Sequence, residues 1–347
     1  MEGNMKKKLL ILVACTAMAF GSLSGCGKQE DATTTATVET SDDLTNERSE
    51  ETNANTEATT QSVDAAGIAA KDRAGNDIII PDKVERIVSM APSTTRFLID
   101  LGLADKIIAV DTNSSIYAAS LTDAVQQFDM MAPDNEALVA LEPDIIFTSG
   151  MSNIGGEDVY KPARDAGICV ADIPSSNSII DITSDLEFIG YAVDEQDKAK
   201  ELIDEFNKNI DYFLNTSKNI TEKKKILFEI SLPSSDYPSI YTFGKGTYLD
   251  DMINYIGAEN ITGDQEGWVS ISEEEAIAMN PDVIVTNVNY VDDAVNAIKT
   301  AQGWENVTAI QNNEVYYIDA DASNQPNNHI VDAMLEMAKQ VYPEYYK

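Results

Sequence analysis

The stretch Glu136–Thr148, EALVALEPDIIFT, returns in altered form at Glu274–Thr286 as EEAIAMNPDVIVT. Aligned without a gap, the two stretches share Glu, Ala, Pro, Asp, Ile and Thr, and most other positions are apolar in both. In each, about two turns of helix precede a proline, which forces the residue before it out of the α region, and a buried strand follows. A helix–strand unit that occurs twice in one chain predicts two domains of similar architecture.

Strand and helix patterns alternate around both copies of this unit. Gly102 and Gly257 close the helical runs before them, and each helical run has strand-like runs on its two sides. The strand-like runs are residues 86–89, 107–110, 225–230 and 315–318, and the helical runs are residues 95–101 and 247–256. Such alternation indicates parallel sheets covered by helices. We therefore predict an α/β fold with two Rossmann-like lobes.

A longer helical pattern lies between the two lobes. Residues 194–217 place seven apolar side chains at helical spacing: Ala199, Leu202, Ile203, Phe206, Ile210, Phe213 and Leu214. This helix, about 36 Å long, would join the lobes as a single strut, or else be an ordinary surface helix of one domain. The predicted divisions are an N-terminal lobe at 67–193, a linking helix at 194–222 and a C-terminal lobe at 223–347.

The N-terminus carries an export signal. Lys6, Lys7 and Lys8 precede an apolar run, Leu9–Phe20, which is too short to span a bilayer. The run ends at Leu-Ser-Gly-Cys26, which resembles the lipobox of bacterial lipoproteins, so residues 1–25 are a predicted signal peptide. Cys26 is then the lipidated residue that anchors the chain at the extracytoplasmic face of the cell membrane. The alternative is an ordinary cleaved signal with an incidental cysteine.

Residues 26–66 are rich in Thr, Ser, Asn, Asp, Glu and Ala and poor in large apolar side chains. This composition buries too little surface to offset its ordering entropy, so we predict an acidic, disordered tether with a reach of roughly 35 Å. Only Cys169 remains in the folded part, which excludes an intramolecular disulfide. The formal net charge of −35 argues against nucleic acid or an anionic membrane surface as a partner.

The duplicated unit also indicates where a ligand binds. The helix start and the strand end share one rim of each lobe, and ligands of open α/β sheets bind beyond the carboxyl ends of the strands. Glu136 and Glu274 occupy equivalent positions on the two rims, near helix N-termini. Their simpler role is local, because a carboxylate in the first turn suits the helix dipole, and Ser272 with Glu275 has capping-box spacing.

The ordered set of motifs resembles the substrate-binding lipoproteins of ABC importers. It comprises the lipobox, the acidic tether, RIVSMAPSTTRFLIDLGLADKIIAV, ALEPDIIFTSG, YTFGKGTYLDDMINYIGAENI, NPDVIVT and a closing amphipathic helix. The class it resembles captures cobalamin, haem or ferric siderophores in a cleft between two α/β lobes joined by one long helix. The resemblance implies that Glu136 and Glu274 dock on arginines of the membrane permease.

The loops after the strands supply the candidate ligand site, which is rich in aromatic, amide, hydroxyl and thioether groups. These loops are expected at residues 90–95, 111–117, 149–153, 234–241, 287–290 and 321–324. In the cobalamin binders that the chain resembles, aromatic side chains flank the corrin at the positions of Tyr241 and Trp268. Arg96 at the edge and Lys245 are the nearest cations. The candidate ligand-binding residues are Ser93, Thr94, Tyr117, Met130, Met131, Ser149, Tyr241, Trp268, Asn287 and Asn324.

Two departures from the family pattern bear on the ligand. Arg96 replaces a common glutamate, and Gln325-Pro-Asn-Asn-His329 replaces a common Arg-Pro-Gly-Pro-Arg pattern. The loss of both arginines weakens the case for an anionic ligand. We therefore predict cobalamin or another corrinoid as the ligand of a monomeric binding protein, with a ferric siderophore or haem as the alternative.

The sequence offers little for catalysis or a resident cofactor. His329 is the only histidine, which makes a zinc or manganese site improbable, and it is expected to be polar surface or at most an axial haem ligand. The rival class is an exported hydrolase, but neither G-x-S-x-G nor H-E-x-x-H occurs. We predict no enzyme activity, no catalytic residues, no metal site and no cofactor.

Overall fold

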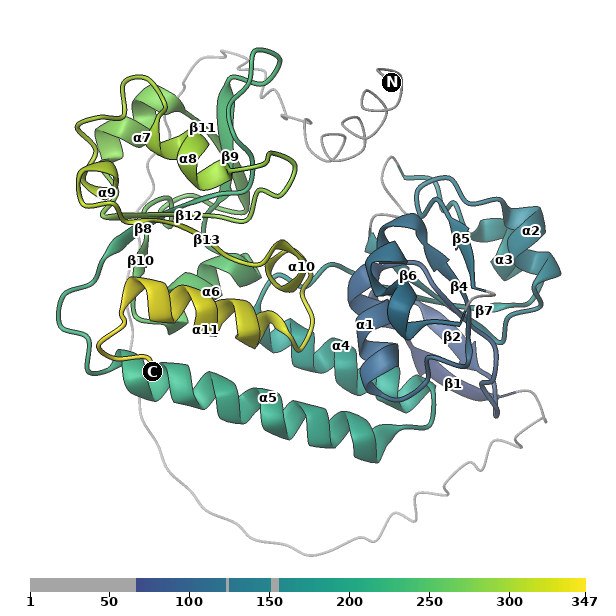
Figure 1. Ribbon diagram of the computed structural model, residues 1–347. Helices are drawn as coiled ribbons and strands as arrows, with labels where there is room; N and C mark the ends of the chain where they lie inside the picture. The colour runs from purple at the N-terminus through teal and green to yellow at the C-terminus, as the bar shows by residue number, and fades with distance from the viewer. Residues whose placement is uncertain (1–66, 123–124, 151–155) are drawn as a thin grey trace, which may run out of the picture. The chain divides into compact units, whose positions relative to one another are not determined.

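The computed structural model describes residues 67–122, 125–150 and 156–347, all within the unit formed by residues 61–347. The predicted signal peptide, Cys26 and the tether lie outside the described residues. The described part contains two α/β lobes, which are joined by a long helix, α5 (Gln196–Ser217) (Figure 1). In this part of the chain, no helix is both long enough and apolar enough to cross a membrane.

The first lobe is built on a five-stranded parallel sheet in the order β5-β4-β3-β6-β7. Its strands are β3 (Ile87–Ser89), β4 (Ile107–Asp111), β5 (Gln126–Phe128), β6 (Ile145–Ser149) and β7 (Cys169–Ile173). Its helices are α1 (Pro92–Asp100), the 3-10 helix η1 (Thr112–Ser120), α2 (Asn135–Ala140) and α3 (Lys161–Asp165). An antiparallel hairpin, β1 (Ile68–Lys71) with β2 (Asp77–Ile80), precedes the sheet and packs near β7.

The second lobe has a four-stranded parallel sheet in the order β10-β8-β12-β13. Its strands are β8 (Lys225–Glu229), β10 (Glu259–Asn260), β12 (Val283–Thr286) and β13 (Val315–Tyr317). A separate antiparallel pair is formed by β9 (Ser239–Phe243) and β11 (Trp268–Ser272). The helices are α6 (Tyr248–Tyr255), α7 (Glu273–Met279), α8 (Ala294–Lys299), α9 (Thr308–Gln311), α10 (Ala320–Ser323) and α11 (Ile330–Val341).

Two helices connect the lobes. α4 (Ile179–Ala192) begins beside the second lobe, where its first backbone N–H donates to Asp251 of α6 at 3.0 Å, and it runs back to contact α1 of the first lobe. α5 then runs beside α4 to the second lobe and packs on α6 and α11 (Figure 1). At 22 residues, α5 is about 33 Å long. Its buried face, which includes Phe206, Ile210 and Phe213, joins one apolar core that contains residues of both sheets. This favours the strut over a surface helix of one domain.

The duplicated stretch forms the same structure in both lobes. α2 and α7 begin after the N-caps Asp134 and Ser272, whose side chains accept backbone N–H bonds at 3.1 Å. Glu142 and Asn280, directly before the prolines, have left-handed φ values of 47° and 50°, so each helix stops there. The chain then enters β6 and β12. Glu136 and Glu274 are each the second residue of their helix, and both are exposed.

Three local expectations were wrong. α1 begins at Pro92, not Thr95, because proline is well suited to the first helical turn, so Ser93 and Thr94 lie in a helix instead of a loop. Tyr241 lies within strand β9, since Ser239–Phe243 alternates and pairs with β11. Residues 112–117, expected to be loop, belong to η1, which is capped by the Asp111 carboxylate. The helix closures at Gly102 and Gly257 are confirmed, with φ values of 85° and 88°.

Candidate functional site

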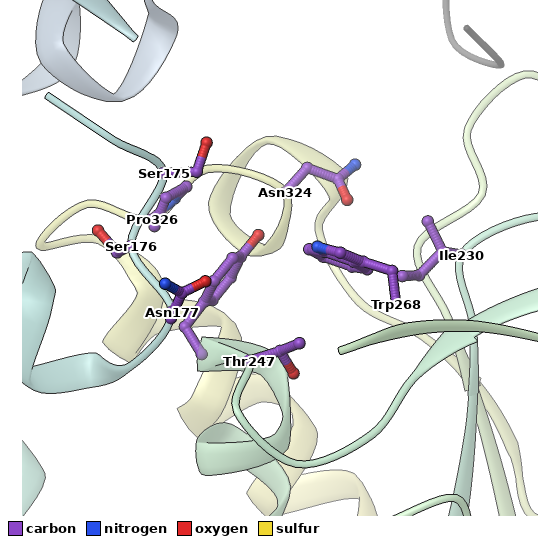
Figure 2. A pocket seen from close by; sticks show the side chains of 9 residues that line it. Ser175, Ser176, Asn177, Ile230, Thr247, Trp268, Asn324 and Pro326 are labelled. Carbon is purple, nitrogen blue, oxygen red and sulfur yellow. The ribbon is translucent and has the colours of Figure 1, made fainter. Parts of the chain in front are cut away.

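Two adjacent cavities lie where the first and second lobes meet. Their volumes are about 170 and 180 Å³, and they share the residues Ser175, Ser176, Asn324 and Pro326. The first cavity is further lined by Asn177, Ile230, Thr247, Tyr248 and Trp268 (Figure 2). The second is further lined by Ala91, Pro92, Ser93, Phe97, Met130, Ser149, Ile173, Pro174, Asp185 and Gln325. Both cavities therefore draw on the carboxyl-terminal ends of strands and the loops that follow.

An aromatic cluster forms one wall of the first cavity. Trp268, the first residue of β11, stacks on Tyr241 of β9 with ring centroids 6.0 Å apart and planes 15° from parallel. The rings of Phe243 and Tyr248 meet it edge-on at 6.3 and 6.5 Å. Trp268 is 43% exposed, so part of the indole faces the cavity while the rest is held by these rings. The arrangement offers a rigid flat apolar surface.

A buried carboxylate lies in the wall of the second cavity. Asp185 of α4 accepts a hydrogen bond from Ser176 at 2.8 Å and pairs with the Arg73 guanidinium at 2.6 Å. Burial raises the pKa of Asp185, whereas the bonds from Arg73 and Ser176 stabilise its ionised form. Sequence reasoning missed Arg73, which the β1–β2 hairpin brings to this point. The turn residues Asp72-Arg-Ala-Gly-Asn76, followed by an apolar strand, were the available signal.

A chain of buried hydroxyl groups supports the first turn of α1. Ser89 and Thr95 are 2.8 Å apart between their hydroxyl oxygens, and Thr95 is 2.9 Å from Ser114. Ser114 in turn donates to Asp111, whose pKa is raised by burial. All four residues are buried. This chain fixes the end of β3, the cap of η1 and the start of α1, where Ser93 lines the second cavity.

A second polar cluster joins α1 to the segment between α10 and α11. Asp100 of α1 lies 2.7 Å from Arg96 Nη2, 2.9 Å from Asn328 Nδ2 and 2.9 Å from His329 Nε2. These contacts hold the pKa of Asp100 below its ordinary value against the opposing effect of burial. Arg96, which replaces a common glutamate of the family pattern, is thus paired inside its own helix.

His329 is not merely polar surface, because both of its ring nitrogens face carboxylates. Nε2 faces Asp100, and Nδ1 lies 3.1 Å from Asp332. The hydrogen bond with Asp100 raises the pKa of His329. A serine triad that uses this histidine would require one of the two pairs to break. Among the described residues, no three His, Cys, Asp or Glu side chains are grouped to hold a metal ion.

Five of the predicted ligand residues line the cavities: Ser93, Met130, Ser149, Trp268 and Asn324. The other five have different surroundings. Tyr241 supports Trp268, and Asn287 is buried and donates to Asn324 at 2.7 Å. Thr94 is only 1% exposed, Met131 is an exposed side chain, and the Tyr117 hydroxyl donates to Gln325. The loop predicted at 149–153 lies outside the described residues after Gly150.

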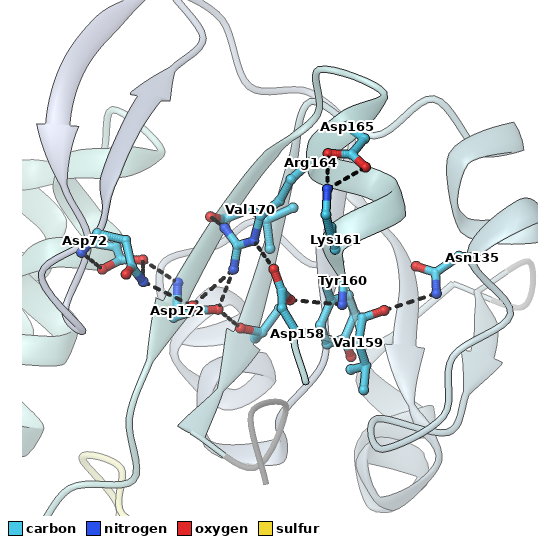
Figure 3. Close-up of polar contacts among 12 residues, drawn as sticks. Asp72, Asn135, Asp158, Val159, Tyr160, Lys161, Arg164, Asp165, Val170 and Asp172 are labelled. Atoms are coloured by element: carbon cyan, nitrogen blue, oxygen red, sulfur yellow. Dashed lines mark hydrogen bonds and ion pairs between the residues drawn. The ribbon is translucent and has the colours of Figure 1, made fainter. Parts of the chain in front are cut away.

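The two predicted docking glutamates stand on firmly held helices. In the first lobe, Asn135 donates to the Val159 carbonyl at 2.9 Å, which fixes the start of α2 to the segment before α3. Arg164 of α3 reaches Asp158 and both oxygens of Asp172, each at 2.9 Å (Figure 3). In the second lobe, Glu273 of α7 accepts from the Trp304 indole at 3.1 Å. Both glutamates therefore project from ordered elements.

Comparisons with known proteins agree with this architecture. A family model described as periplasmic binding protein matches residues 87–322. An uncharacterized ABC transporter substrate-binding lipoprotein of Bacillus subtilis is 29% identical over 83% of this chain and 89% of its own length. A vitamin B12-binding protein of Vibrio parahaemolyticus is 24% identical over 74% of this chain and 90% of its own length.

Solved structures give the same result for the fold. A possible iron-binding, periplasmic solute-binding protein of Staphylococcus epidermidis superposes with a TM-score of 0.66 and 29% identity, covering 75% of this chain and 100% of that one. A molybdate-binding protein of Haemophilus influenzae superposes with a TM-score of 0.67 and 20% identity, covering 80% and 92%. The ligands that these names give differ, so the fold is shared across several ligand classes.

Proposed function

We propose a ligand for this chain from the premise that it belongs to the periplasmic binding protein family and is the substrate-binding protein of an ABC importer. The proposed ligand is cobalamin or another corrinoid. The observation that carries the proposal is the aromatic wall, in which Trp268 stacks on Tyr241 and makes T-shaped contacts with Phe243 and Tyr248. A flat apolar surface with amide and hydroxyl groups around it suits a large, flat and nearly neutral molecule.

The charges around the cleft support a neutral ligand. Arg73 pairs with Asp185 at 2.6 Å, Arg96 with Asp100 at 2.7 Å, and Lys245 with Glu266 at 3.2 Å. Because each cation near the cleft already has a carboxylate partner, the attraction for a carboxylate or phosphate ligand is largely cancelled. The vitamin B12-binding relative supports the same choice.

The alternative is a ferric siderophore or haem. Arg73 pairs with Asp185, which lines the second cavity, and Arg96 pairs with Asp100, so a strongly anionic ligand would compete with these carboxylates for the two arginines. A smaller oxyanion is a further possibility in this family, since one solved relative binds molybdate. These ligands would all bind through charge, which distinguishes them from a corrinoid.

Calorimetry separates these ligand classes. The purified full chain in detergent would be titrated with cyanocobalamin, haemin, a hydroxamate and a catecholate ferric siderophore, and molybdate, each at low and moderate salt. A corrinoid site predicts binding of cyanocobalamin whose affinity changes little with salt, because little of it is screened Coulomb attraction. Binding of haemin, a siderophore or molybdate instead, with steep salt dependence, would overturn the proposal.

We also propose how the protein is held and how it meets its transporter. Cys26 is the proposed lipid anchor on the extracytoplasmic face, supported by the lipoprotein name of the Bacillus subtilis relative. Glu136 and Glu274 are the proposed contacts with the permease, supported by their equivalent, exposed positions on α2 and α7. Both roles are tested by the variants described in the Discussion.

A further inference from the structure

The six residues between α10 and α11 belong to the second lobe and contact the first. We call residues 324–329 the strap. Its first half lines the cavities: Asn324 and Pro326 border both, and Gln325 borders the second. Its second half, Asn328 and His329, reaches α1 of the first lobe. One short segment of the second lobe therefore forms cavity wall and also contacts the first lobe.

The Asp100 carboxylate is the main attachment point of the strap. Asn328 and His329 both donate to its Oδ2 atom at 2.9 Å, although they lie more than 200 residues away in sequence. The Asp100 side chain is 12% exposed, and Arg96 holds its orientation from the previous helical turn. A second tie lies nearby, since Tyr117 donates to Gln325 and its ring lies 5.9 Å from the Arg96 guanidinium.

The cavities behind the strap are small. Their volumes of about 170 and 180 Å³ fall below the roughly 300–1,000 Å³ of sites that enclose a drug-sized ligand. Asn324 and Pro326 are part of both walls. A ligand larger than either cavity therefore needs a wider cleft, and because the strap forms part of both walls and is tied to α1, movement of the strap and its lobe away from α1 would widen both cavities.

We propose that the strap is the gate of the cleft and that the Asp100–His329 pair is its latch, which must release before a large ligand enters. The proposal depends on the proposed function only in taking the cleft as the ligand site, and not on which ligand binds. Asp100 and His329 are then residues that determine access without touching the ligand.

The latch depends on the proton held by His329. Asp100 and Arg96 face this imidazole from α1, and Asp332 faces it from α11. The two carboxylates raise the pKa of His329, while burial and Arg96 oppose them, and the net direction is upward. A raised folded-state pKa means that the pair contributes fully below the ordinary histidine pKa of about 6.5 and is lost as pH rises through the raised value. The gate should therefore open more readily as the pH rises.

The first test uses the fact that His329 is the only histidine in the chain. In protein labelled with ¹³C-histidine, a single imidazole signal reports its titration without assignment. We expect a pKa above the ordinary value in the wild type, and a lower one in Asp100→Asn. Asp332→Asn is the matched control, because Asp332 lies on the other side of the ring and is 69% exposed, so it should lower the pKa less. Equal titration in wild type and Asp100→Asn would overturn the latch.

The second test measures the opening itself. Hydrogen exchange of strap amides, corrected for intrinsic rates, should rise roughly threefold between about pH 5 and about pH 8, as expected for a partly exposed ion pair. His329→Gln keeps a neutral donor toward Asp100, so its exchange should not follow pH in this way. If the two proteins show the same pH dependence, or neither shows any, the latch is wrong. His329→Gln also tests the latch if Asp100→Asn fails to fold.

The final step adds cyanocobalamin as the probe. Its association rate should increase with pH in the wild type in step with strap exchange, and should lose this dependence in His329→Gln. Association that is independent of strap exchange would overturn the gate. If the ligand-free measurements agree with the latch but cyanocobalamin does not bind, the corrinoid proposal fails and the latch stands.

Discussion

The two tryptophans of the chain provide a matched pair for testing the binding site. Trp268 lines the first cavity and is 43% exposed, whereas Trp304 is 2% exposed and donates to Glu273 at 3.1 Å. The chain contains no other tryptophan. Trp268→Ala therefore removes an aromatic wall of the cleft, and Trp304→Phe removes a buried indole N–H in the outer core of the second lobe.

The expected effects follow from these positions. Truncating an aromatic anchor at a binding site costs about 1–3 kcal/mol, so Trp268→Ala should weaken cyanocobalamin binding roughly 5- to 150-fold. Because the indole is already partly exposed, Trp268→Ala should lower the free energy of unfolding by less than the roughly 3–5 kcal/mol lost when a fully buried aromatic side chain is truncated. Trp304→Phe leaves a Glu273 oxygen without its donor, which should cost about 1–3 kcal/mol of stability and little affinity.

Two measurements on each protein decide the case. Calorimetry with cyanocobalamin gives the affinity, and urea unfolding followed by circular dichroism gives the stability. In Trp304→Phe, the remaining fluorescence comes from Trp268 alone and should be quenched on binding. If Trp268→Ala binds cyanocobalamin as tightly as wild type while Trp304→Phe binds more weakly, the aromatic wall is not the ligand site.

Three further outcomes are expected. Cys26→Ser should block maturation and alter membrane attachment in cell fractionation; a variant processed and anchored like wild type would disprove lipidation at this residue. Reversing both Glu136 and Glu274 to Arg should impair uptake more than either single change and leave ligand affinity within a few tenths of a kcal/mol, whereas unchanged uptake would contradict docking. Burial, with the Glu273 carboxylate nearby, raises the pKa of Glu229 to about 8. The free energy of unfolding that its protonated form contributes is therefore fully present below about pH 4.5 and is lost as the pH rises through about 8. Glu229→Gln should raise the melting temperature more at pH 8 than at pH 5, and an equal effect at both would refute this.

The duplicated unit could be predicted from sequence because its signals are local. A capping residue, a short amphipathic run, a proline and an apolar strand all act within about a dozen positions, and α2–β6 and α7–β12 form as expected. Where the backbone change is set by one residue, as at Asn280 before Pro281, even the helix end is predictable. The α/β class follows from the alternation of these helix and strand signals.

The contacts that shape the cleft could not be predicted in the same way. Arg73 meets Asp185 across 112 positions, and His329 meets Asp100 across 229. No periodicity in one chain specifies such pairs, because they depend on how separate elements pack. The antiparallel pair of β9 and β11 was missed for a different reason. Its strands alternate, as Trp268–Ser272 shows, but a parallel sheet was expected on both sides of it.

The spacing of the proposed ligand and docking residues links the two roles proposed for each rim. Trp268 lies six residues before Glu274, and Met130, in the wall of the second cavity, lies six residues before Glu136. In the second lobe the intervening residues form β11 and the N-cap of α7, with no loop between. In the first lobe the Met130 carbonyl accepts from Tyr160 at 3.1 Å, and Val159 holds Asn135. Each glutamate is therefore fixed to the cavity wall of its own lobe. If the strap releases and the lobes separate, the distance between Glu136 and Glu274 must change with them, so a permease that contacts both would sense whether the cleft is open.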